Sequence, residues 1–433
     1  MRGLWSSSLG AGIEREVETR NGAMVPALRR LQCRLGRLSP TTSSCFLHRV
    51  EHGTCDTRTD TDTGNETEAN LHPDADGGTD VEMPSKVASV EPPATVVVTG
   101  ANGFIAQHCV AALLETGYRV VGTVRSASKA DLVKETHRCH ARLEIVVVED
   151  VTSTRAYLDA LRSSRPSAIL HLAAPFRYDA TDFERDLMRP AVGGSVAVLE
   201  AAAVLGSVRR VVQTNSFACI YDAAAGPCPG RTYSARDWSP LTYEDGVRAA
   251  DVPTAYRASK AAAEKAAWRY MRERKPAFDL VSLCPTMVFG PFLPASRPKT
   301  IDEVNTSNRL VWSVLSAGPS RQVPPTRGPV WVHVRDVADA HVGAIRVPEA
   351  GGRRYLLSGG VYCNQELADL SRGLAGKNLS RIPLGEPGRR ESETHFDVDA
   401  TEAEKVLALR WRSLEDCLSE LVPQLFETEQ ESR

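Results

Sequence analysis

The feature of this sequence that most limits its fold is a regular alternation of short apolar runs with helix-length segments, which begins at Ala94. The runs are rich in valine, isoleucine and leucine, as strands buried on both faces of a sheet are. Strands joined by helix-length crossovers form βαβ units and hence a parallel sheet. We therefore expect an α/β fold of the Rossmann type, in which helices cover both faces of a doubly wound parallel sheet.

Six apolar runs are expected to be strands of this sheet, and the segments between them contain the expected helices. The expected strands cover residues 94–100, 118–125, 142–150, 167–174, 208–216 and 278–285. The expected helices cover residues 103–117, 156–164, 183–206 and 255–274. Beyond Pro285, prolines punctuate loops and short elements, and one further strand and helix are expected over 329–347.

The length of 433 residues suggests two or three domain-sized units, or one large α/β domain with extensions. We expect a dinucleotide-binding Rossmann domain over 94–285 and a smaller C-terminal, mainly substrate-binding lobe over 286–430. That lobe is expected to be interleaved with the sheet and with the long loop at 221–253. The ten cysteines stand singly and none forms a C-x-x-C pair, so we expect no metal cluster and a reducing compartment.

The first ninety residues differ in composition from the rest. Residues 51–90 hold ten acidic and two basic side chains. A segment of this composition buries too little apolar surface to offset the loss of chain entropy on folding. We expect 1–90 to be a disordered or low-complexity extension, either a dispensable tail or sequence upstream of a true start at Met83. The Arg- and Ser-rich residues 1–50 leave a mitochondrial presequence as an alternative to a cytoplasmic location, although three early glutamates oppose it.

The charge balance excludes some classes of partner. The chain has 52 basic and 54 acidic side chains, a net charge of −2, which points to no nucleic-acid partner. No uncharged apolar run reaches about 18 residues, so we expect no membrane span. We expect a small-molecule substrate instead, and both a monomer and a homodimer stay open.

A glycine-containing turn joins the first expected strand to the first expected helix, Gly100-Ala-Asn-Gly103-Phe-Ile-Ala106. Gly100 permits the tight turn, Gly103 lets the backbone approach a pyrophosphate, and the helix N-terminus offers N–H groups to phosphates. Because this motif stands between a strand and a helix, it predicts a dinucleotide site. The second strand ends in Arg125 where NAD sites carry an acid, so we expect NADP(H), with Lys129 adding a second charge to the 2′-phosphate.

Asp150 and Val151, after the third strand, are expected to reach the adenine edge of the cofactor. The alternative for Asp150 is an ordinary acid at a strand end that caps the next helix. The full set of expected cofactor contacts is Gly100, Asn102, Gly103, Phe104, Ile105, Arg125, Lys129, Asp150, Val151, Ala173, Tyr256, Lys260, Pro285 and Val288.

Three residues form the expected catalytic group: Ser216, Tyr256 and Lys260. Tyr256 and Lys260 stand four residues apart and so share one helix face. A free tyrosine has a pKa of about 10, and a nearby cation lowers it. Tyr256 is then suited to donate a proton to a carbonyl oxygen as hydride reaches the carbon. Ser216, at the carboxyl end of the fifth strand, is placed to orient that oxygen.

These motifs, in this order, resemble the extended short-chain dehydrogenase/reductase superfamily. The resemblance covers about residues 94–425 and is closest to the dihydroflavonol reductase-like branch, with its cinnamoyl-CoA reductases and fungal aldehyde and methylglyoxal reductases. It rests on "VVVTGANGFIA", "HLAAPF", "AYRASKAAAEKAAW", "CPTMVFGP", "VNTSN" and "VRDVADAHV". It implies that Pro285 and Val288 line the nicotinamide pocket and that Phe176 and Phe217 border the substrate, although both phenylalanines also suit a plain core.

The sequence departs from the family pattern at three places. Asn215 replaces a serine before Ser216, Gly193 stands where the family has asparagine, and His333 stands where it often has aspartate. We read His333 as a packing or surface histidine.

The resemblance implies an NADPH-dependent reductase of aldehydes or ketones. Oxidation of a hydroxysteroid-like or other secondary alcohol is the enzymatic alternative. A non-catalytic NADP-binding sensor is the other, although sensors typically lack the tyrosine or the lysine.

Overall fold

The computed structural model describes residues 87–174, 179–390 and 395–432. The chain separates into two compact units, Met1–Asp74 and Ala75–Arg433, and all described residues belong to the second. The expected extension up to residue 86 and the expected substrate residue Phe176 lie outside the described residues.

The end of the expected disordered extension is corrected by the structure. Residues 87–90 belong to the folded unit, and Val90 is fully buried. The Val90 N–H donates to Ile345 O at 3.0 Å, and its carbonyl accepts from the Tyr118 hydroxyl at 2.7 Å. The valines at 87 and 90 supply the apolar surface that the acidic residues before them lack.

A seven-stranded, all-parallel sheet forms the centre of the unit, in the order β10-β7-β5-β4-β1-β2-β3. Its strands are β1 (Thr95–Thr99), β2 (Arg119–Val124), β3 (Leu143–Val147), β4 (Ala168–His171), β5 (Arg210–Thr214), β7 (Asp279–Pro285) and β10 (Arg354–Leu357). The six expected strands are confirmed. The strand order reverses beside β1, so the loop after β1 lies at a topological switch point.

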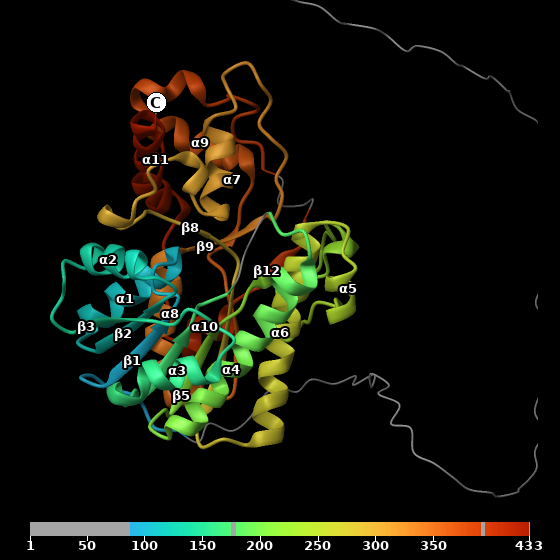
Figure 1. The fold of residues 1–433 in the computed structure, drawn as a ribbon. Helices are drawn as coiled ribbons and strands as arrows, with labels where there is room; N and C mark the ends of the chain where they lie inside the picture. The colour runs from blue at the N-terminus through green and yellow to red at the C-terminus, as the bar shows by residue number, and fades with distance from the viewer. Residues whose placement is uncertain (1–86, 175–178, 391–394, 433) are drawn as a thin grey trace, which may run out of the picture. The chain divides into compact units, whose positions relative to one another are not determined.

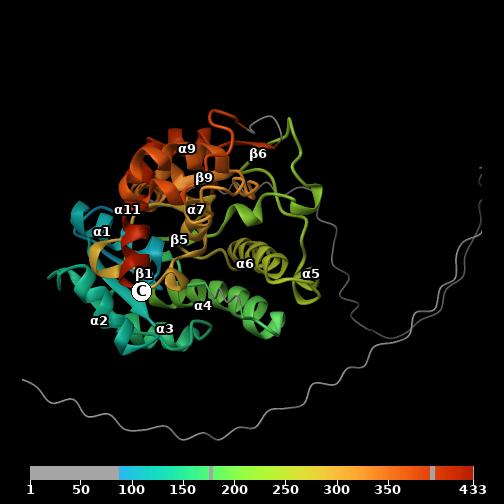
Figure 2. The same ribbon diagram turned by 90° about the horizontal axis from the view of Figure 1, so that it is seen from above.

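Helices cover both faces of this sheet, which confirms the Rossmann-type architecture. On one face lie α1 (Phe104–Thr116), α2 (Ala127–Thr136) and α8 (Val334–Arg346), whose apolar side chains share a core with the strands. On the other lie α3 (Thr154–Leu161), α4 (Arg189–Leu205) and α6 (Val252–Arg274), as Figure 2 shows. Each of these helices presents small or apolar side chains to the strands, so both layers pack closely.

One helical stretch of the described residues, Glu184–Leu205, is long and apolar enough to cross a membrane by length and composition. It comprises a π-helical turn (Glu184–Met188) followed by α4. α4 packs against α3 and α6 and contributes Val198 and Leu199 to the core. This stretch therefore serves as a core helix of the α/β unit.

The chain after β7 builds a second group of elements beyond the carboxyl edge of the sheet (Figure 1). Its three-stranded sheet has the order β11-β9-β8. A core of its own joins helices of this group. Its elements are β8 (Met287–Phe289), α7 (Thr306–Leu315), β9 (Val330–His333), β11 (Gly360–Val361), α9 (Asn364–Leu374) and α11 (Leu414–Glu431). The short helix α10 (Thr401–Val406) instead packs beside β10, and Ala403 joins the core of the central sheet.

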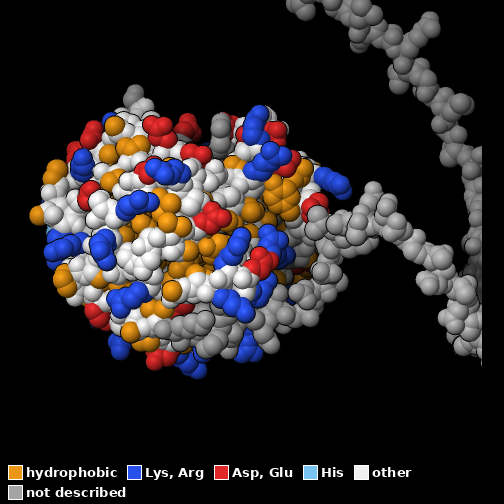
Figure 3. Space-filling view, turned by 60° about the horizontal axis from the view of Figure 1, so that its bottom comes forward, with side chains coloured by type: hydrophobic (Ala, Val, Ile, Leu, Met, Phe, Trp, Pro, Cys, Tyr) orange, Lys and Arg blue, Asp and Glu red, His pale blue; other side chains and the backbone are white. Residues whose placement is uncertain are grey.

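Two pairings connect early and late parts of the chain. β10 joins the central sheet beside β7. β6 (Thr232–Ser234), from the loop before the short helix α5 (Tyr243–Val247), pairs with β12 (Asp397–Asp399). The loop after β5 is thereby held by a strand that lies more than 160 residues later. On the face seen in Figure 3, basic and acidic side chains lie among one another, with hydrophobic side chains between them.

Candidate active site

Most of the predicted site residues surround a cavity of about 790 Å³ at the carboxyl edge of the central sheet. The predicted residues that line it are Gly100, Gly103, Phe104, Ile105, Ser216, Phe217, Tyr256, Pro285 and Val288. They follow β1 and β5, lie near the beginning of α1 or α6, end β7 (Pro285) or lie in β8 (Val288). This edge is where ligands bind in open α/β sheets.

A smaller cavity of about 170 Å³ adjoins the first, because Gly100 and Gly103 line both. Its other predicted lining residues are Asn102, Arg125, Val151 and Ala173. No acidic side chain occurs among the described residues of this lining. The two cavities form a path from the end of β2 to the end of β7. The residues expected to bind the two halves of a dinucleotide therefore line adjoining cavities.

Three predicted cofactor residues line neither cavity: Lys129, Asp150 and Lys260, of which Lys260 is described below. Lys129 lies on α2, four residues beyond Arg125. Asp150 is exposed, and its carboxylate accepts hydrogen bonds from the Thr152 hydroxyl at 2.7 Å and the Thr152 N–H at 2.8 Å. These hydrogen bonds lower the pKa of Asp150. Ser153, rather than Asp150, caps α3.

The turn after β1 has the geometry that its glycines predict. Gly100 has a φ of +65°, and a Cβ there would lie 3.0 Å from the Cα of Ala173. Gly103 is the N-cap of α1 and has no side chain to occupy the first N–H groups of the helix. An anion at this end would therefore meet backbone donors and the positive end of the helix dipole.

Thr99, which the sequence analysis did not single out, fixes the opposite wall of this turn. Its hydroxyl oxygen accepts from the N–H groups of Leu172 and Ala173 at 3.1 and 3.0 Å. Its own proton is then left for Nδ1 of His171, at 3.0 Å. The last residue of β1 thus holds the loop after β4 against Gly100. The position of Thr99 directly before Gly100 is the sequence feature that could have indicated this role.

The three expected catalytic residues come together at the larger cavity. Ser216 and Tyr256 line it, from the end of β5 and the second turn of α6. Lys260 is buried below, and its Nζ donates to the carbonyl of Thr214 at 2.9 Å. Burial lowers the pKa of Lys260. The Ser216 hydroxyl oxygen accepts from the Ala218 N–H at 3.1 Å, so its own proton remains available.

A buried ion pair supports this group and was missed by the sequence analysis. Glu264, one turn beyond Lys260, accepts from Arg354 Nε at 2.8 Å and Nη2 at 3.1 Å, and also from the Ser282 hydroxyl. Burial raises the pKa of Glu264, but the Arg354 guanidinium outweighs it and holds this pKa below its usual value. The spacing of Tyr256, Lys260 and Glu264 was a signal for Glu264, whereas nothing local pointed to Arg354.

Arg354 also holds the loop that follows Ser216. It donates to the carbonyls of Cys219 at 3.0 Å and Ala235 at 2.7 Å, and its guanidinium stacks over the ring of Trp238 at 3.8 Å. One side chain of β10 therefore connects both ends of the 217–239 loop to α6.

An aromatic cluster forms one wall of the larger cavity. Phe217 stacks on Tyr221 at 4.9 Å between ring centroids and contacts Phe396 at 5.7 Å. Phe217 is buried, so it both lines the cavity and packs in a core. Phe396 and His395 also line this cavity. They come from a segment some 180 residues later, and no local pattern linked them to Ser216.

The structure shows what surrounds His333 and Gly193, two of the positions that depart from the family pattern. His333 is buried and caps α8, since its Nδ1 accepts from the Arg335 N–H at 3.0 Å. This confirms the reading of a packing histidine. A Cβ on Gly193 would lie 3.4 Å from Cγ2 of Thr152, an ordinary van der Waals distance, so the chain after β3 packs beside this part of α4.

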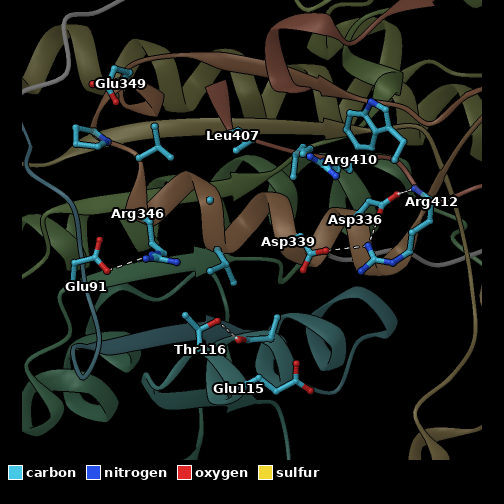
Figure 4. A pocket seen from close by; sticks show the side chains of 18 residues that line it. Glu91, Glu115, Thr116, Asp336, Asp339, Arg346, Glu349, Leu407, Arg410 and Arg412 are labelled. Atoms are coloured by element: carbon cyan, nitrogen blue, oxygen red, sulfur yellow. Dashed lines mark hydrogen bonds and ion pairs between the residues drawn. The ribbon is translucent and has the colours of Figure 1, made fainter. Parts of the chain in front are cut away.

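A third cavity, of about 940 Å³, lies between α1, α8 and residues 407–412 (Figure 4). None of the predicted site residues lines it. Charged side chains around it pair with each other: Glu91 with Arg346 at 3.3 Å, and Arg412 with Asp339 at 3.0 Å. Because it lies away from the carboxyl edge of the sheet and several of its charges are paired, we do not assign the active site here.

The sequence pattern of the NAD dependent epimerase/dehydratase family matches residues 96–358. The NADPH-dependent methylglyoxal reductase GRE2 of Saccharomyces cerevisiae is 34% identical over 345 residues, covering 77% of this chain and 99% of the relative. The ketoreductase azaE of Aspergillus niger is 32% identical over 345 residues, covering 77% of this chain and 97% of the relative.

A solved structure is similar over the same region. The yeast methylglyoxal/isovaleraldehyde reductase Gre2, complexed with NADPH, superposes with a TM-score of 0.73 at 33% sequence identity. The match covers 78% of this chain and 99% of that protein.

Proposed function

Since this chain belongs to the NAD dependent epimerase/dehydratase family, within the extended short-chain dehydrogenases/reductases, we propose that it is an NADPH-dependent reductase of aldehydes or ketones. The observation that carries the proposal is one cavity shared by the glycine turn, Ser216 and Tyr256. Lys260 is anchored directly beneath it. The relatives named as methylglyoxal reductase and ketoreductase support a carbonyl compound as substrate.

The residues present fit NADP(H). The uncapped N-terminus of α1 would hold the pyrophosphate through backbone N–H groups. Arg125, in a lining without acidic side chains among the described residues, would hold the 2′-phosphate. Pro285 and Val288 would face the nicotinamide end. When bound, NADPH supplies the hydride that the carbonyl carbon accepts.

The chain's own residues then handle the carbonyl oxygen and its proton. The Ser216 hydroxyl oxygen already accepts from Ala218, so the Ser216 proton is free to donate to the substrate oxygen. The Tyr256 phenol donates the proton that turns this oxygen into a hydroxyl. The Lys260 ammonium favours the phenolate left behind, and Thr214 fixes the ammonium in place.

We also propose that this reaction takes place in the cytoplasm. The seven cysteines of the described residues are free thiols, as a reducing compartment would keep them. Cell fractionation with an antibody against residues 94–430 tests the location, and recovery with mitochondria would contradict it.

The experiment that tests the function follows NADPH oxidation at 340 nm with methylglyoxal, a branched aldehyde and an aromatic ketone. We expect turnover with NADPH, and a fall in kcat of about 100-fold or more for Tyr256→Phe. Tyr270→Phe, later on α6 and outside the cavity, is the matched control and should keep full activity. Tight NADPH binding without turnover on any carbonyl, or full activity of Tyr256→Phe, would contradict the mechanism.

A further inference from the structure

The charges in the lining of the larger cavity are all of one sign. Its described lining residues include two arginines, Arg257 and Arg327, and no aspartate or glutamate. Most of the other lining side chains are apolar or aromatic. A neutral carbonyl compound needs no fixed cation for its recognition, whereas a partly buried cation that forms no direct ion pair carries a desolvation cost. The positive charge of this lining therefore favours a substrate that carries a negative group.

Arg257 is the better placed of the two arginines. It directly follows Tyr256 on α6 and is half-buried, whereas Arg327 lies exposed on a loop at the mouth. Its Nη2 donates to the Thr254 hydroxyl at 2.8 Å. Its Nε is buried and has no hydrogen-bond partner among the described residues. Asp251 is close enough for the Arg257 charge to help lower its pKa. Its carboxylate caps α6 through the Thr254 N–H at 2.7 Å, and no ion pair joins it to Arg257 among the described residues.

The position of Arg257 separates it from the sites proposed for the cofactor phosphates. Its guanidinium is turned back toward Thr254, at the beginning of α6. Lys260, one turn in the other direction, reaches the sheet at Thr214. The proposed phosphate ligands are the N-terminus of α1 and Arg125, which lines only the smaller cavity. Arg257 thus brings to the cavity that Tyr256 also lines a charge that is hydrogen-bonded to Thr254.

We propose that the preferred carbonyl substrate carries a carboxylate, as an oxo acid does, and that Arg257 binds it. The planar guanidinium matches a carboxylate with two parallel hydrogen bonds. A single half-buried cation suits a monoanion, and Arg327 at the mouth attracts it. This inference rests on the proposed function, since it names the substrate class of the same site.

The test compares two aldehydes that differ in one charge, 4-carboxybenzaldehyde and methyl 4-formylbenzoate. We expect the wild-type chain to show a kcat/KM for the acid about tenfold or more above that for the ester, as a charge-assisted pair gives. Arg257→Gln should abolish this preference by raising KM for the acid. Arg269→Gln, exposed on the same helix outside the cavity, removes an equal charge and should keep the preference.

A second measurement uses only the wild-type chain, in case Arg257→Gln does not fold. The alcohol product 4-(hydroxymethyl)benzoate should inhibit ester reduction about tenfold more strongly than 4-(hydroxymethyl)benzamide. Equal inhibition, an acid that is no better than the ester, or a preference that survives in Arg257→Gln would overturn the inference. If ester and acid both fail as substrates while methylglyoxal is reduced, the inference fails and the proposed function stands. If no carbonyl compound is reduced, the proposed function itself fails.

Discussion

At the scale of single residues, the sequence predicts those site residues that stand only a few positions apart in the chain. Tyr256 and Lys260 stand one helical turn apart, and Gly100 and Gly103 stand within one turn of chain, so both pairs were visible without a structure. Arg354 and Phe396 meet the same site from 80 or more residues beyond the end of α6 at Arg274. Such contacts depend on how the chain returns to the sheet, and no local pattern encodes them.

The first prediction at this scale concerns Arg125 and the choice of cofactor. Arg125→Ala removes the only charged side chain among the described residues that line the smaller cavity. Because this charge would meet the 2′-phosphate, we expect KM for NADPH to rise about tenfold to a hundredfold. KM for NADH should change less than twofold.

Steady-state kinetics with both cofactors check this outcome. Arg119→Ala, at the opposite end of β2 and also exposed, is the matched control and should behave as the wild type. An equal loss with NADPH and NADH would mean that Arg125 acts on the fold instead of on the phosphate.

At the scale of elements, the strands and helices with strong periodicity were predicted, and β10 was not. β10 has four residues and begins with an arginine, which argues against a buried strand when read locally. In the structure Glu264 forms an ion pair with that arginine, and loop carbonyls accept further hydrogen bonds from its guanidinium. The arginine can therefore be buried in the sheet. Tertiary pairing therefore decided the structure of this segment, where propensity alone pointed elsewhere.

The prediction for this element is that Arg354→Met destabilises the protein and loosens the cavity wall. Removing the guanidinium leaves Glu264 buried without its cation, at a cost of about 3–5 kcal/mol. We expect urea unfolding to show this loss and KM for the carbonyl substrate to rise, because the 217–239 loop loses its anchor. NADPH binding should change little.

Two further variants separate the causes. Arg354→Met combined with Glu264→Gln removes both charges and should recover part of the stability. Arg353→Met breaks only the partly exposed pair with Glu402 and should cost less than about 1 kcal/mol. A similar cost for Arg353→Met and Arg354→Met would contradict the anchoring role.

At the scale of the whole folded unit, buried histidines make stability depend on pH. Burial lowers the pKa of His108 and His341 to about 4. His341 is neutral in the fold, since its Nδ1 donates to Val337 O and its Nε2 accepts from the Thr214 hydroxyl. In the unfolded chain a histidine has a pKa of about 6.5. The unfolded state therefore binds more protons between these values, and stability falls as the pH drops from 6.5 toward 4.

We expect each of these two histidines to remove about 2 kcal/mol of stability between pH 7.5 and pH 5. Urea unfolding at the two pH values measures the loss. His341→Gln should reduce the pH dependence by roughly one histidine's share. Substitution of His140, which is only partly buried, serves as the comparison. A pH dependence unaffected by His341→Gln would place its origin elsewhere.

The late position of β10 and β12 has a consequence for how the enzyme is made. Translation delivers the glycine turn, Ser216, Tyr256 and Lys260 well before Arg354 and Phe396 leave the ribosome. A nascent chain ending near residue 300 already holds the residues proposed for cofactor and catalysis, yet it lacks the arginine that anchors the 217–239 loop and one aromatic wall of the cavity. Competence to bind the nucleotide should therefore precede competence to bind the carbonyl compound during synthesis, and incomplete chains would hold cofactor without consuming it.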